Sequence, residues 1–397
     1  MMSSAASTAI PAEEELHWLA LKMVAGLGTR RAGQLIETFR SPEAIFRASR
    51  SELEGAGLPG SVAQSIASGC AFDEALEQQA KMRAAGACLV TINSATYPPL
   101  LREVYDPPVV LYARGKIEIL QRTLFAVVGT RRPTPYGMAV AERLSADLSA
   151  AGLVIVSGMA SGIDTASHRG ALSVNAPTIA VLGCGVDIVY PSENRKLSEQ
   201  IANTGVVLSE FPMGSAAFPQ NFPIRNRIVS GASVGLLVVE GAQYSGSAIT
   251  ARLALDQGRE VFAVPGSITS KMSWGPNLLI KQGAKLVQDW NDVIVDLPPA
   301  VRRKLIDDGK QRLLDLGDPE AEGPAAGNGN HADLAGPESE ISRRLLQKLS
   351  VDTPIHLDGL IEIMERCSTS EVIAALFELE MLGLAKQLPG RQYVRKF

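Results

Sequence analysis

From about Thr123 onward, the chain alternates short apolar runs with longer segments that have helical periodicity. The apolar runs are Leu124–Val128, Leu153–Val156, Thr178–Leu182, Val206–Leu208, Val234–Val239, Val261–Val264 and Lys285–Val287. Segments with a helical pattern lie between several of them, at Gly137–Ala151, Asp164–Val174 and Ser247–Gln257. Buried apolar strands that alternate with helices are typical of a parallel sheet covered on both faces. The pattern therefore predicts an α/β fold with a doubly wound, Rossmann-like parallel sheet.

The sheet is expected to begin before this pattern does. Two further apolar runs, Leu89–Ile92 and Val109–Tyr112, are suited to edge strands. We therefore expect an extended Rossmann-like domain over residues 87–300.

Residues 13–86 are predicted to form a domain of short helices. Two glycine turns, Gly26-Leu27-Gly28 and Gly57-Leu58-Pro59-Gly60, are each followed by a helical stripe of apolar residues. This arrangement is similar to helix-hairpin-helix or SAM-like units, whose glycine turns can contact a DNA backbone. A small helical packing module is the favoured interpretation over DNA contact, because the motif is short. The preceding residues 1–12, rich in Ser and Ala, are expected to be a disordered tail.

The C-terminal part is expected to be a separate small domain that follows a linker. Residues 301–340 are assigned as the linker, because the stretch 306–340 contains six Gly, three Pro and an excess of acidic residues. Three amphipathic segments and a hairpin follow, at Ile341–Leu349, Leu357–Met364, Thr369–Leu382 and Leu384–Val394, the hairpin turning at Pro389-Gly390. Three helices and a hairpin predict a winged-helix domain over residues 341–397.

The charge of the chain excludes a protein coated in basic residues. The formal net charge is −4 and the pI is about 5.8, and the region 124–297 has 13 basic and 13 acidic residues. A nucleic-acid site in such a chain requires cations gathered in one place. No apolar run reaches the roughly 18–20 residues of a membrane span. The four cysteines form no CxxC pair and are expected to be thiols in a reducing cytoplasm.

The most informative functional signal lies in the loops that follow the strands. In an open parallel sheet, ligands bind at the carboxyl ends of the strands, where loops lead into helix N-termini that attract anions. Glycine allows close backbone approach, hydroxyl groups donate hydrogen bonds, and arginine provides a charged fork for phosphate. The predicted site residues are Gly129, Thr130, Arg131, Ser157, Gly158, Gly162, Arg225, Asn226, Arg227, Ser245, Gly246, Ser247 and Lys281. Together they predict an anion-binding site at this edge of the sheet.

The balance of charge in the domain favours one type of anion. A near-neutral domain with one basic pocket suits a short length of flexible backbone better than a long, rigid duplex. Binding of a single strand also requires aromatic faces on which bases stack. Phe222 lies next to the predicted arginines and is the preferred stacking residue, so the pattern predicts single-stranded DNA as the ligand. For Asp164, a candidate helix N-cap, and for Glu240, structural roles are as well supported as direct contact.

The sequence contains no motif for catalysis or for a cofactor. The first strand is not followed by the GxGxxG of dinucleotide-binding proteins, and the GxxxxGK[ST] of NTPases is absent. The four histidines form no metal-ligand pair, and no nucleophile–base arrangement is found. We therefore expect no enzyme activity, no cofactor and no bound metal.

The strand-end loops belong to a longer series of ordered motifs between about Tyr97 and Val293. The motifs are Asp106-Pro107-Pro108, Val128-Gly129-Thr130-Arg131, Ser157-Gly158-Met159, Gly162-Ile163-Asp164, Val181-Leu182-Gly183-Cys184-Gly185, Arg225-Asn226-Arg227, Ser245-Gly246-Ser247 and Phe262-Ala263-Val264-Pro265-Gly266. In this series the chain resembles the DNA-processing protein A (DprA, also called Smf) family.

The resemblance implies a cytoplasmic protein of natural transformation that binds and protects incoming single-stranded DNA and loads the RecA recombinase. It also implies a homodimer that forms through the Rossmann domain. By match to the family motif, Arg131 would contact DNA, with Arg225 and Arg227 supporting the pocket. Ser161 stands where relatives often carry Arg, so one positive contact is expected to be missing.

Two other functions remain alternatives at this point. The fold also resembles that of nucleotide phosphoribohydrolases, but the loop 241–247 lacks the glycine pair of their PGGxGT pattern. A transcription factor acting through the winged helix is the second alternative. The third predicted helix of that domain carries Glu371, Glu378 and Glu380, which would repel phosphate in a major groove.

Overall fold

The structure is a computed structural model that describes residues 10–242, 245–305, 340–349, 355–364, 384–388 and 392–395, with four isolated positions between 372 and 379. By its internal contacts the chain divides into two compact units, Met1–Gly317 (unit 1) and Asp318–Phe397 (unit 2). Each unit is described by itself. No helix among the described residues is long and apolar enough to cross a membrane.

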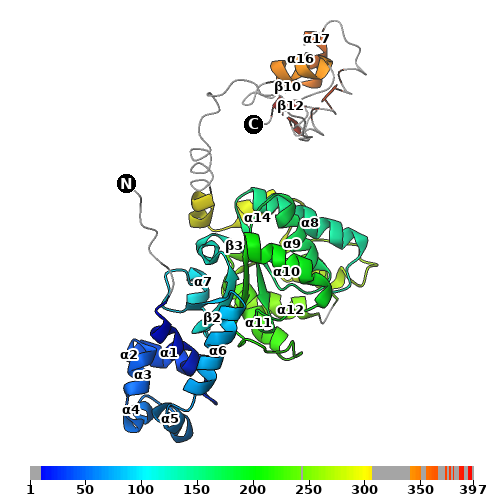
Figure 1. Cartoon of the computed structure of the whole chain (residues 1–397). Coiled ribbons are helices and arrows are strands. Elements are labelled where there is room, and N and C mark those ends of the chain that lie inside the picture. The colour runs from blue at the N-terminus through cyan, green and yellow to red at the C-terminus, as the bar shows by residue number, and fades with distance from the viewer. Residues whose placement is uncertain are drawn as a thin grey trace, which may run out of the picture. The chain divides into compact units, whose positions relative to one another are not determined.

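Unit 1 begins with short helices and continues into an alternation of strands and helices (Figure 1). The helices that precede the first strand are α1 (Ala12–Met23), α2 (Thr29–Phe39), α3 (Pro42–Arg47), α4 (Arg50–Gly55), α5 (Gly60–Ala67) and α6 (Phe72–Ala84). The strands are β1 (Cys88–Thr91), β2 (Val110–Gly115), β3 (Leu124–Val128), β4 (Val154–Ser157), β5 (Thr178–Leu182), β6 (Val206–Ser209), β7 (Gly235–Val238), β8 (Glu260–Ala263) and β9 (Lys285–Leu286). The helices between and after them are α7 (Pro99–Arg102), η1 (Ile117–Gln121), α8 (Pro135–Ala150), α9 (Ile163–Ser173), η2 (Ser192–Asn194), α10 (Arg195–Thr204), α11 (Asn221–Gly231), α12 (Gly246–Asp256), α13 (Trp274–Lys281) and α14 (Trp290–Asp296).

The strands form one nine-stranded sheet in the order β1-β2-β6-β5-β4-β3-β7-β8-β9. All neighbours from β6 to β9 pair in parallel, whereas β2 pairs antiparallel with both β6 and β1. This order confirms the doubly wound parallel sheet and its extension by edge strands. From β3 the chain first builds toward β6 and then returns to build from β7 toward β9. The switch point of the sheet therefore lies between β3 and β7.

The two faces of the sheet are covered by different helices because successive side chains of a strand point to opposite faces. On β3, Phe125 and Val127 pack with apolar residues of α8, α9 and α14. Ala126 and Val128 pack on the other face with residues of α7, α11 and α12. All five residues of β3 are buried, as expected of a strand that is central in a covered parallel sheet.

The N-terminal helices pack directly on the sheet. Their core, which includes Trp18 and Leu35, is continuous with Leu89 of β1 and Tyr112 of β2 and with apolar residues of α10. The chain therefore buries one apolar interior that runs from the helical segment into the edge of the sheet. Residues 299–305 are helical, with Leu305 packed in the core of the sheet domain, and residues 306–339 of the expected linker lie outside the described residues.

Unit 2 contains α16 (Glu340–Lys348), α17 (Leu357–Ile363) and a three-stranded sheet in the order β10-β12-β11. The predicted hairpin is β11 (Ala385–Leu388) paired with β12 (Gln392–Arg395), whereas β10 (Ile355–His356) was not predicted. Its two residues are too few to show a strand period. Most of the third predicted helix and the Pro389-Gly390 turn lie outside the described residues.

A buried histidine in α9 makes the stability of unit 1 sensitive to pH. His168 is fully buried, with Nδ1 2.8 Å from Oγ1 of Thr178. Its Nε2 has no hydrogen-bond partner among the described residues. Burial, together with the charge of Arg225, lowers the pKa of His168 to about 3.

We predict that acid destabilises the fold through His168. Below pH ~6.5, His168 binds a proton in the unfolded chain but not in the folded chain. The free energy of unfolding therefore falls by up to about 1.4 kcal/mol per pH unit. Urea unfolding of the wild type and of His168→Gln, at about pH 7.5 and about pH 5.5, measures this loss. The variant should have the smaller loss of stability on acidification, and equal losses in the two proteins would contradict the prediction.

Candidate functional site

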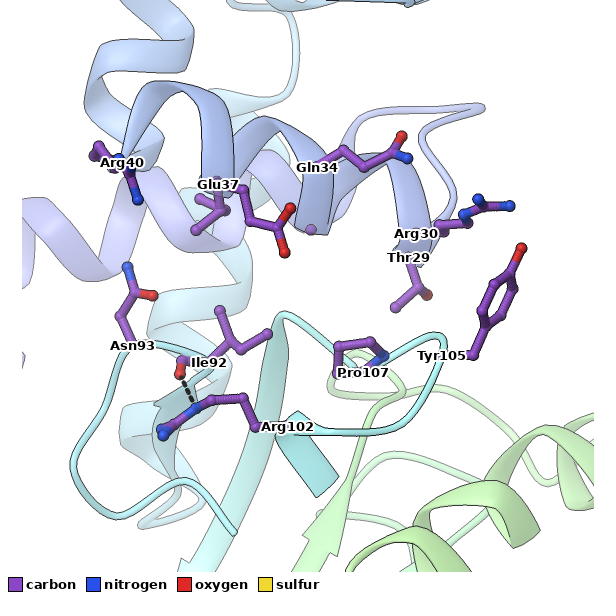
Figure 2. Close-up of a pocket in the computed structure, with 12 residues that line it drawn as sticks. Thr29, Arg30, Gln34, Glu37, Arg40, Ile92, Asn93, Arg102, Tyr105 and Pro107 are labelled. Atoms are coloured by element: carbon purple, nitrogen blue, oxygen red, sulfur yellow. Dashed lines mark hydrogen bonds between the residues drawn. The ribbon is translucent and has the colours of Figure 1, made fainter. Parts of the chain in front are cut away.

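Two hollows of unit 1 bear on function. The larger has a volume of about 730 Å³ and lies between α2 and the chain around α7 (Figure 2). We call it the α2 cleft; its polar lining includes Arg30, Gln34, Glu37, Arg40, Arg102 and Tyr105. The smaller has a volume of about 230 Å³ and lies where β3, β4 and β7 end. We call it the strand-end pocket.

The strand-end pocket brings together most of the residues predicted from the sequence. It lies at the switch point of the sheet, where doubly wound folds bind their ligands. The predicted residues that line it are Gly129, Thr130, Arg131, Gly158, Phe222, Arg225, Asn226, Ser245, Gly246 and Ser247. Their loops come from segments far apart in the chain, and the parallel sheet brings them together.

Four predicted residues do not line the strand-end pocket. Ser157 is buried and donates a 2.7 Å hydrogen bond to the carbonyl of Val127. Gly162 has φ +86° and is the N-cap of α9, where a Cβ would lie 2.5 Å from the carbonyl oxygen of Thr130. Lys281 is the last residue of α13. The fourth is Arg227.

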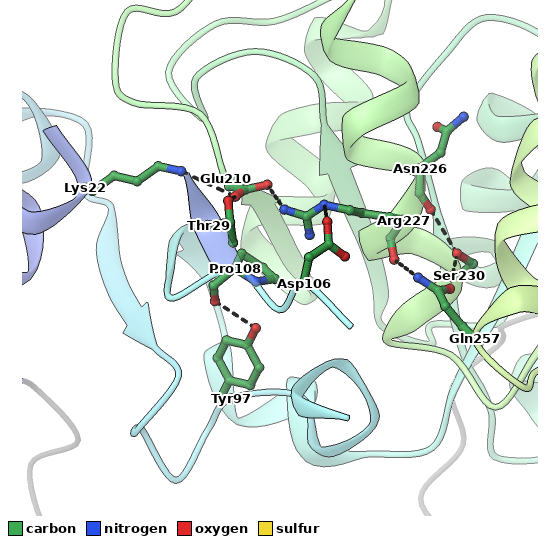
Figure 3. Close-up of polar contacts among 10 residues, drawn as sticks. All are labelled: Lys22, Thr29, Tyr97, Asp106, Pro108, Glu210, Asn226, Arg227, Ser230 and Gln257. Carbon is green, nitrogen blue, oxygen red and sulfur yellow. Dashed lines mark hydrogen bonds and ion pairs between the residues drawn. The ribbon is translucent and has the colours of Figure 1, made fainter. Parts of the chain in front are cut away.

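Arg227 takes part in a network of ion pairs and hydrogen bonds (Figure 3). Its Nη2 lies 2.6 Å from Oε2 of Glu210, and its Nε lies 3.2 Å from Oδ2 of Asp106. Glu210 also accepts hydrogen bonds from Lys22 of α1 and from Thr29 of α2, at 3.4 and 3.1 Å. Burial alone raises the pKa of Glu210, but the charges of Lys22 and Arg227 outweigh it and hold this pKa below its ordinary value. Arg227 therefore ties α11 to the N-terminal helices.

Arg225, two residues earlier in α11, forms the floor of the strand-end pocket. It is only 4% exposed, and its Nη1 donates to the carbonyl oxygens of Gly158 and Val181. A Cβ at position 158 would lie 2.4 Å from the Arg225 guanidinium. The glycine in this loop is therefore required by the buried arginine as well as by any ligand.

An aromatic ring and an exposed cation lie above this floor. The guanidinium carbon of Arg131 is 4.8 Å from the centre of the half-buried Phe222 ring, and that of Arg225 is 5.7 Å from it. Arg131 is exposed, and no ion pair occupies it in the part of the chain that the structure describes. The pocket thus combines an aromatic face with a guanidinium that is free to bind an anion.

Asp164 has a different role from the one considered for it. It is not the N-cap of α9, because Gly162 takes that position and Asp164 lies within the first turn. The positive φ of Gly162 allows the chain to reverse there, which a residue with a side chain rarely does. Burial raises the pKa of Asp164, and the nearby guanidinium of Arg225 opposes this rise. Its carboxylate lines the pocket and faces the buried arginine.

Glu240, which precedes the loop 241–247 that was compared with the hydrolase pattern, is engaged in holding a helix. Its two carboxylate oxygens accept hydrogen bonds from Oγ1 and N of Thr134, at 2.6 and 2.8 Å. Thr134 is in turn the N-cap of α8 and accepts a hydrogen bond from the amide of Gly137. Glu240 is buried, so its hydrogen bonds with Thr134 are shielded from water.

The structure also places residues in the pocket that the sequence analysis did not list. Val229, Ile249 and Thr250 line it from α11 and α12. Val229 lies four residues after Arg225, which is one helical turn. From this spacing Val229 could have been predicted, had it been known which face of α11 is turned toward the pocket.

Comparison with known proteins identifies the family of the chain. Residues 88–298 match the family model of DNA recombination-mediator protein A, and residues 330–391 match the DprA winged helix domain. The chain is 34% identical to Protein Smf of Synechocystis over 402 residues, which cover 96% of this chain and 99% of that protein. The chain belongs to the DprA/Smf family.

Further relatives of the family support the same assignment. Protein Smf of Escherichia coli is 37% identical over 310 residues, 77% of each chain. The crystal structure of DNA processing protein A from Streptococcus pneumoniae superposes with a TM-score of 0.62 at 34% identity, covering 73% of this chain and 99% of that one. The family match confirms the predicted winged-helix domain, and the DprA/Smf relatives are DNA-processing proteins.

We predict that Glu240 and Thr134 stabilise the fold as a pair. Glu240→Ala leaves the partly buried donors of Thr134 without an acceptor and should lower the free energy of unfolding by about 2 kcal/mol. Thr134→Val should have a similar effect, and the double variant should lose less than the sum of the two. Urea unfolding of the four proteins measures this coupling. Strictly additive losses would show that the pair does not act as a unit.

Proposed function

We propose that this protein binds single-stranded DNA in the strand-end pocket and delivers it to a RecA-type recombinase without catalysing a reaction. The observation that carries the proposal is the placement of Arg131 over the Phe222 ring above the buried Arg225. A guanidinium binds phosphate and an aromatic face stacks a base, and single-strand binders combine these two contacts.

The loop before α12 adds a second feature suited to phosphate. Ser245 is the N-cap of this helix, yet its side chain makes no capping hydrogen bond to the helix. Its Oγ lies 2.7 Å from Oγ of Ser247 instead. A helix N-terminus attracts anions through its amide groups and its dipole, so the phosphate of a bound strand fits here.

The size of the pocket favours a single strand over a duplex. Duplex DNA is read by elements that enter grooves about 6–12 Å wide, whereas this pocket is a hollow of about 230 Å³. A short piece of a flexible strand can enter such a hollow, and a rigid double helix cannot. The strand-end pocket therefore recognises a local piece of backbone with its base.

The remaining parts of the proposal rest on membership of the family. A recombination mediator hands its strand to a recombinase, so we expect a RecA-type partner, protection of incoming DNA during natural transformation and a cytoplasmic location. We also expect a homodimer formed through the Rossmann domain. The nucleotide phosphoribohydrolase alternative has less support, since Glu240 is engaged with Thr134.

We predict that Arg131→Ala weakens binding to single-stranded DNA by about tenfold, because one charge-assisted contact to phosphate is lost. The slope of log affinity against log salt should fall by about 0.7. Fluorescence anisotropy with a labelled oligothymidylate, at several salt concentrations, measures both. Arg143→Ala is the matched control, since Arg143 is an exposed arginine of α8 that pairs with Asp147 and should leave both quantities unchanged. Wild-type affinity and slope in folded Arg131→Ala would remove Arg131 from the site.

We predict that the purified protein releases neither free base nor phosphate from nucleoside monophosphates. The physical reason is that the loop 241–247 lacks the glycine pair of the hydrolase pattern, and the neighbouring carboxylate of Glu240 is buried and bonded to Thr134. Chromatography of the reaction mixture over hours provides the measurement. Turnover that follows the protein through purification and disappears in Glu240→Gln would overturn the non-enzymatic proposal.

A further inference from the structure

The α2 cleft is lined by cations from two segments that lie far apart in the sequence. Arg30 of α2 and Arg40, the residue that caps its C-terminus, line one side of the cleft, and Arg102 at the end of α7 lines the other (Figure 2). Arg31 lines an adjoining hollow at the start of α2. Glu37 is the acidic residue that lines the cleft, so the lining carries a surplus of positive charge.

The cations of the cleft are not neutralised within the chain. Over the residues that the structure describes, none of Arg30, Arg40 and Arg102 takes part in an ion pair. Arg102 donates to the backbone carbonyls of Ile92 and Ser94, both at 3.2 Å. These bonds fix its position and leave its charge uncompensated. An anion that enters the cleft therefore meets three guanidinium groups without an ion-pair partner among the described residues, against the single carboxylate of Glu37.

The acidic residue of the adjoining hollow is already paired. Asp106 borders the adjoining hollow together with Arg30 and Arg31. Its carboxylate forms an ion pair with the buried Arg227, so the charge of Arg227 offsets that of Asp106.

An exposed aromatic ring completes the cleft. Tyr105 is 75% exposed, and the guanidinium carbon of Arg30 lies 4.6 Å from the centre of its ring. A tyrosine ring left in water at the edge of a cationic cleft offers a face for a nucleobase, and base–aromatic stacking is tolerant of sequence. The same pairing of arginine and aromatic ring occurs in the strand-end pocket, between Arg131 and Phe222.

Hydrogen bonds and an ion pair stabilise the shape of the cleft. Oγ1 of Thr29, the first residue of α2, donates to Glu210, and Glu210 pairs with Arg227. This buried network sets the position of α2 relative to the loop that carries Tyr105 (Figure 3). The two walls of the cleft are therefore fixed before any ligand arrives, which reduces the ordering that binding requires.

We propose that the α2 cleft is a second binding site for single-stranded DNA, in which its arginines bind the backbone and Tyr105 stacks a base. The cleft has a volume of about 730 Å³, within the range of ligand-binding clefts. The aromatic face favours a nucleic acid over an acidic peptide, which would need only the cations. The proposal deepens the proposed function, since the ligand is the same in chemistry, but it rests on different residues.

The strand-end pocket and the α2 cleft share no lining residue. A further hollow beside Tyr105 is lined by Glu103, Asp106 and Asp256 together with Arg227, so it lacks the surplus of positive charge that the cleft has. We expect a long strand to occupy both sites and a short strand to occupy a single one.

The experiment compares oligothymidylates of about six and about forty nucleotides, of which the first is near the lower end of the usual site sizes of single-strand binders and the second is well beyond them. The variants are the double substitution Arg30→Ala/Arg40→Ala and the single substitution Tyr105→Ala. Arg83→Ala is the matched control, because Arg83 is an exposed arginine of α6 outside the cleft. All changed side chains are exposed, and thermal unfolding of each protein verifies the fold.

We expect the double variant to bind the long strand at least about tenfold more weakly and to bind the short strand as the wild type does. Its salt slope for the long strand should fall by about 1.4, which corresponds to two phosphate contacts. Tyr105→Ala should lose about tenfold for the long strand with an unchanged slope, since stacking carries no charge. In an Arg131→Ala background, the remaining affinity for the long strand should depend on Arg30 and Arg40.

Two results would overturn the proposal. One is a folded double variant with wild-type affinity and slope for the long strand. The other is binding of a labelled polyglutamate peptide that requires Arg30 and Arg40 while DNA binding does not, which would make the cleft a site for an acidic protein. Failure of the strand-end pocket has a different signature: Arg131→Ala would then be silent for both strand lengths while the cleft variants still lose affinity.

Discussion

The buried charge of Arg225 is the constraint on which the strand-end pocket depends. A guanidinium keeps its proton inside a protein, so its burial is tolerated only with satisfied donors and a nearby counter-charge. The carbonyls of Gly158 and Val181 accept its hydrogen bonds, and Asp164 faces it. No side chain fits at position 158 beside this guanidinium. The loop after β4 and the start of α9 are therefore arranged around one cation, which gives the pocket a positive floor.

The same helix connects this floor to the N-terminal helices. Arg225 and Arg227 are two residues apart on α11, so their side chains leave the helix about 200° apart. One enters the strand-end pocket, and the other enters the network with Glu210. Breaking a buried pair leaves the partner's charge uncompensated, which is far more costly than the loss of an exposed ion pair. The placement of α11 therefore determines both the shape of the strand-end pocket and the position of α2.

The sequence predicts the sheet better than it predicts the roles of single residues. Strands β3 and β5 have the predicted bounds, because continuous apolar runs ending in glycine leave few other structures. In the Arg225-Asn226-Arg227 motif, however, nothing local says which arginine faces the pocket, since that depends on where α11 packs on the sheet. The α2 cleft could not be predicted from the sequence for a similar reason. Arg30 and Arg102 line the same cleft only because the N-terminal helices share a core with β1 and β2.

A chain with a net charge of −4 can still bind a polyanion, because charge acts over short distances in salt. At physiological ionic strength, exposed charges more than about 8 Å apart are largely screened from one another. What a strand encounters is therefore the local arrangement of charge. Asp106 and Glu210 are paired with Arg227, while Arg131 of the pocket and Arg30 of the cleft lie exposed beside aromatic rings. Asp106 and Glu210 are thus used to hold the fold, and the cations beside the rings remain available to phosphate.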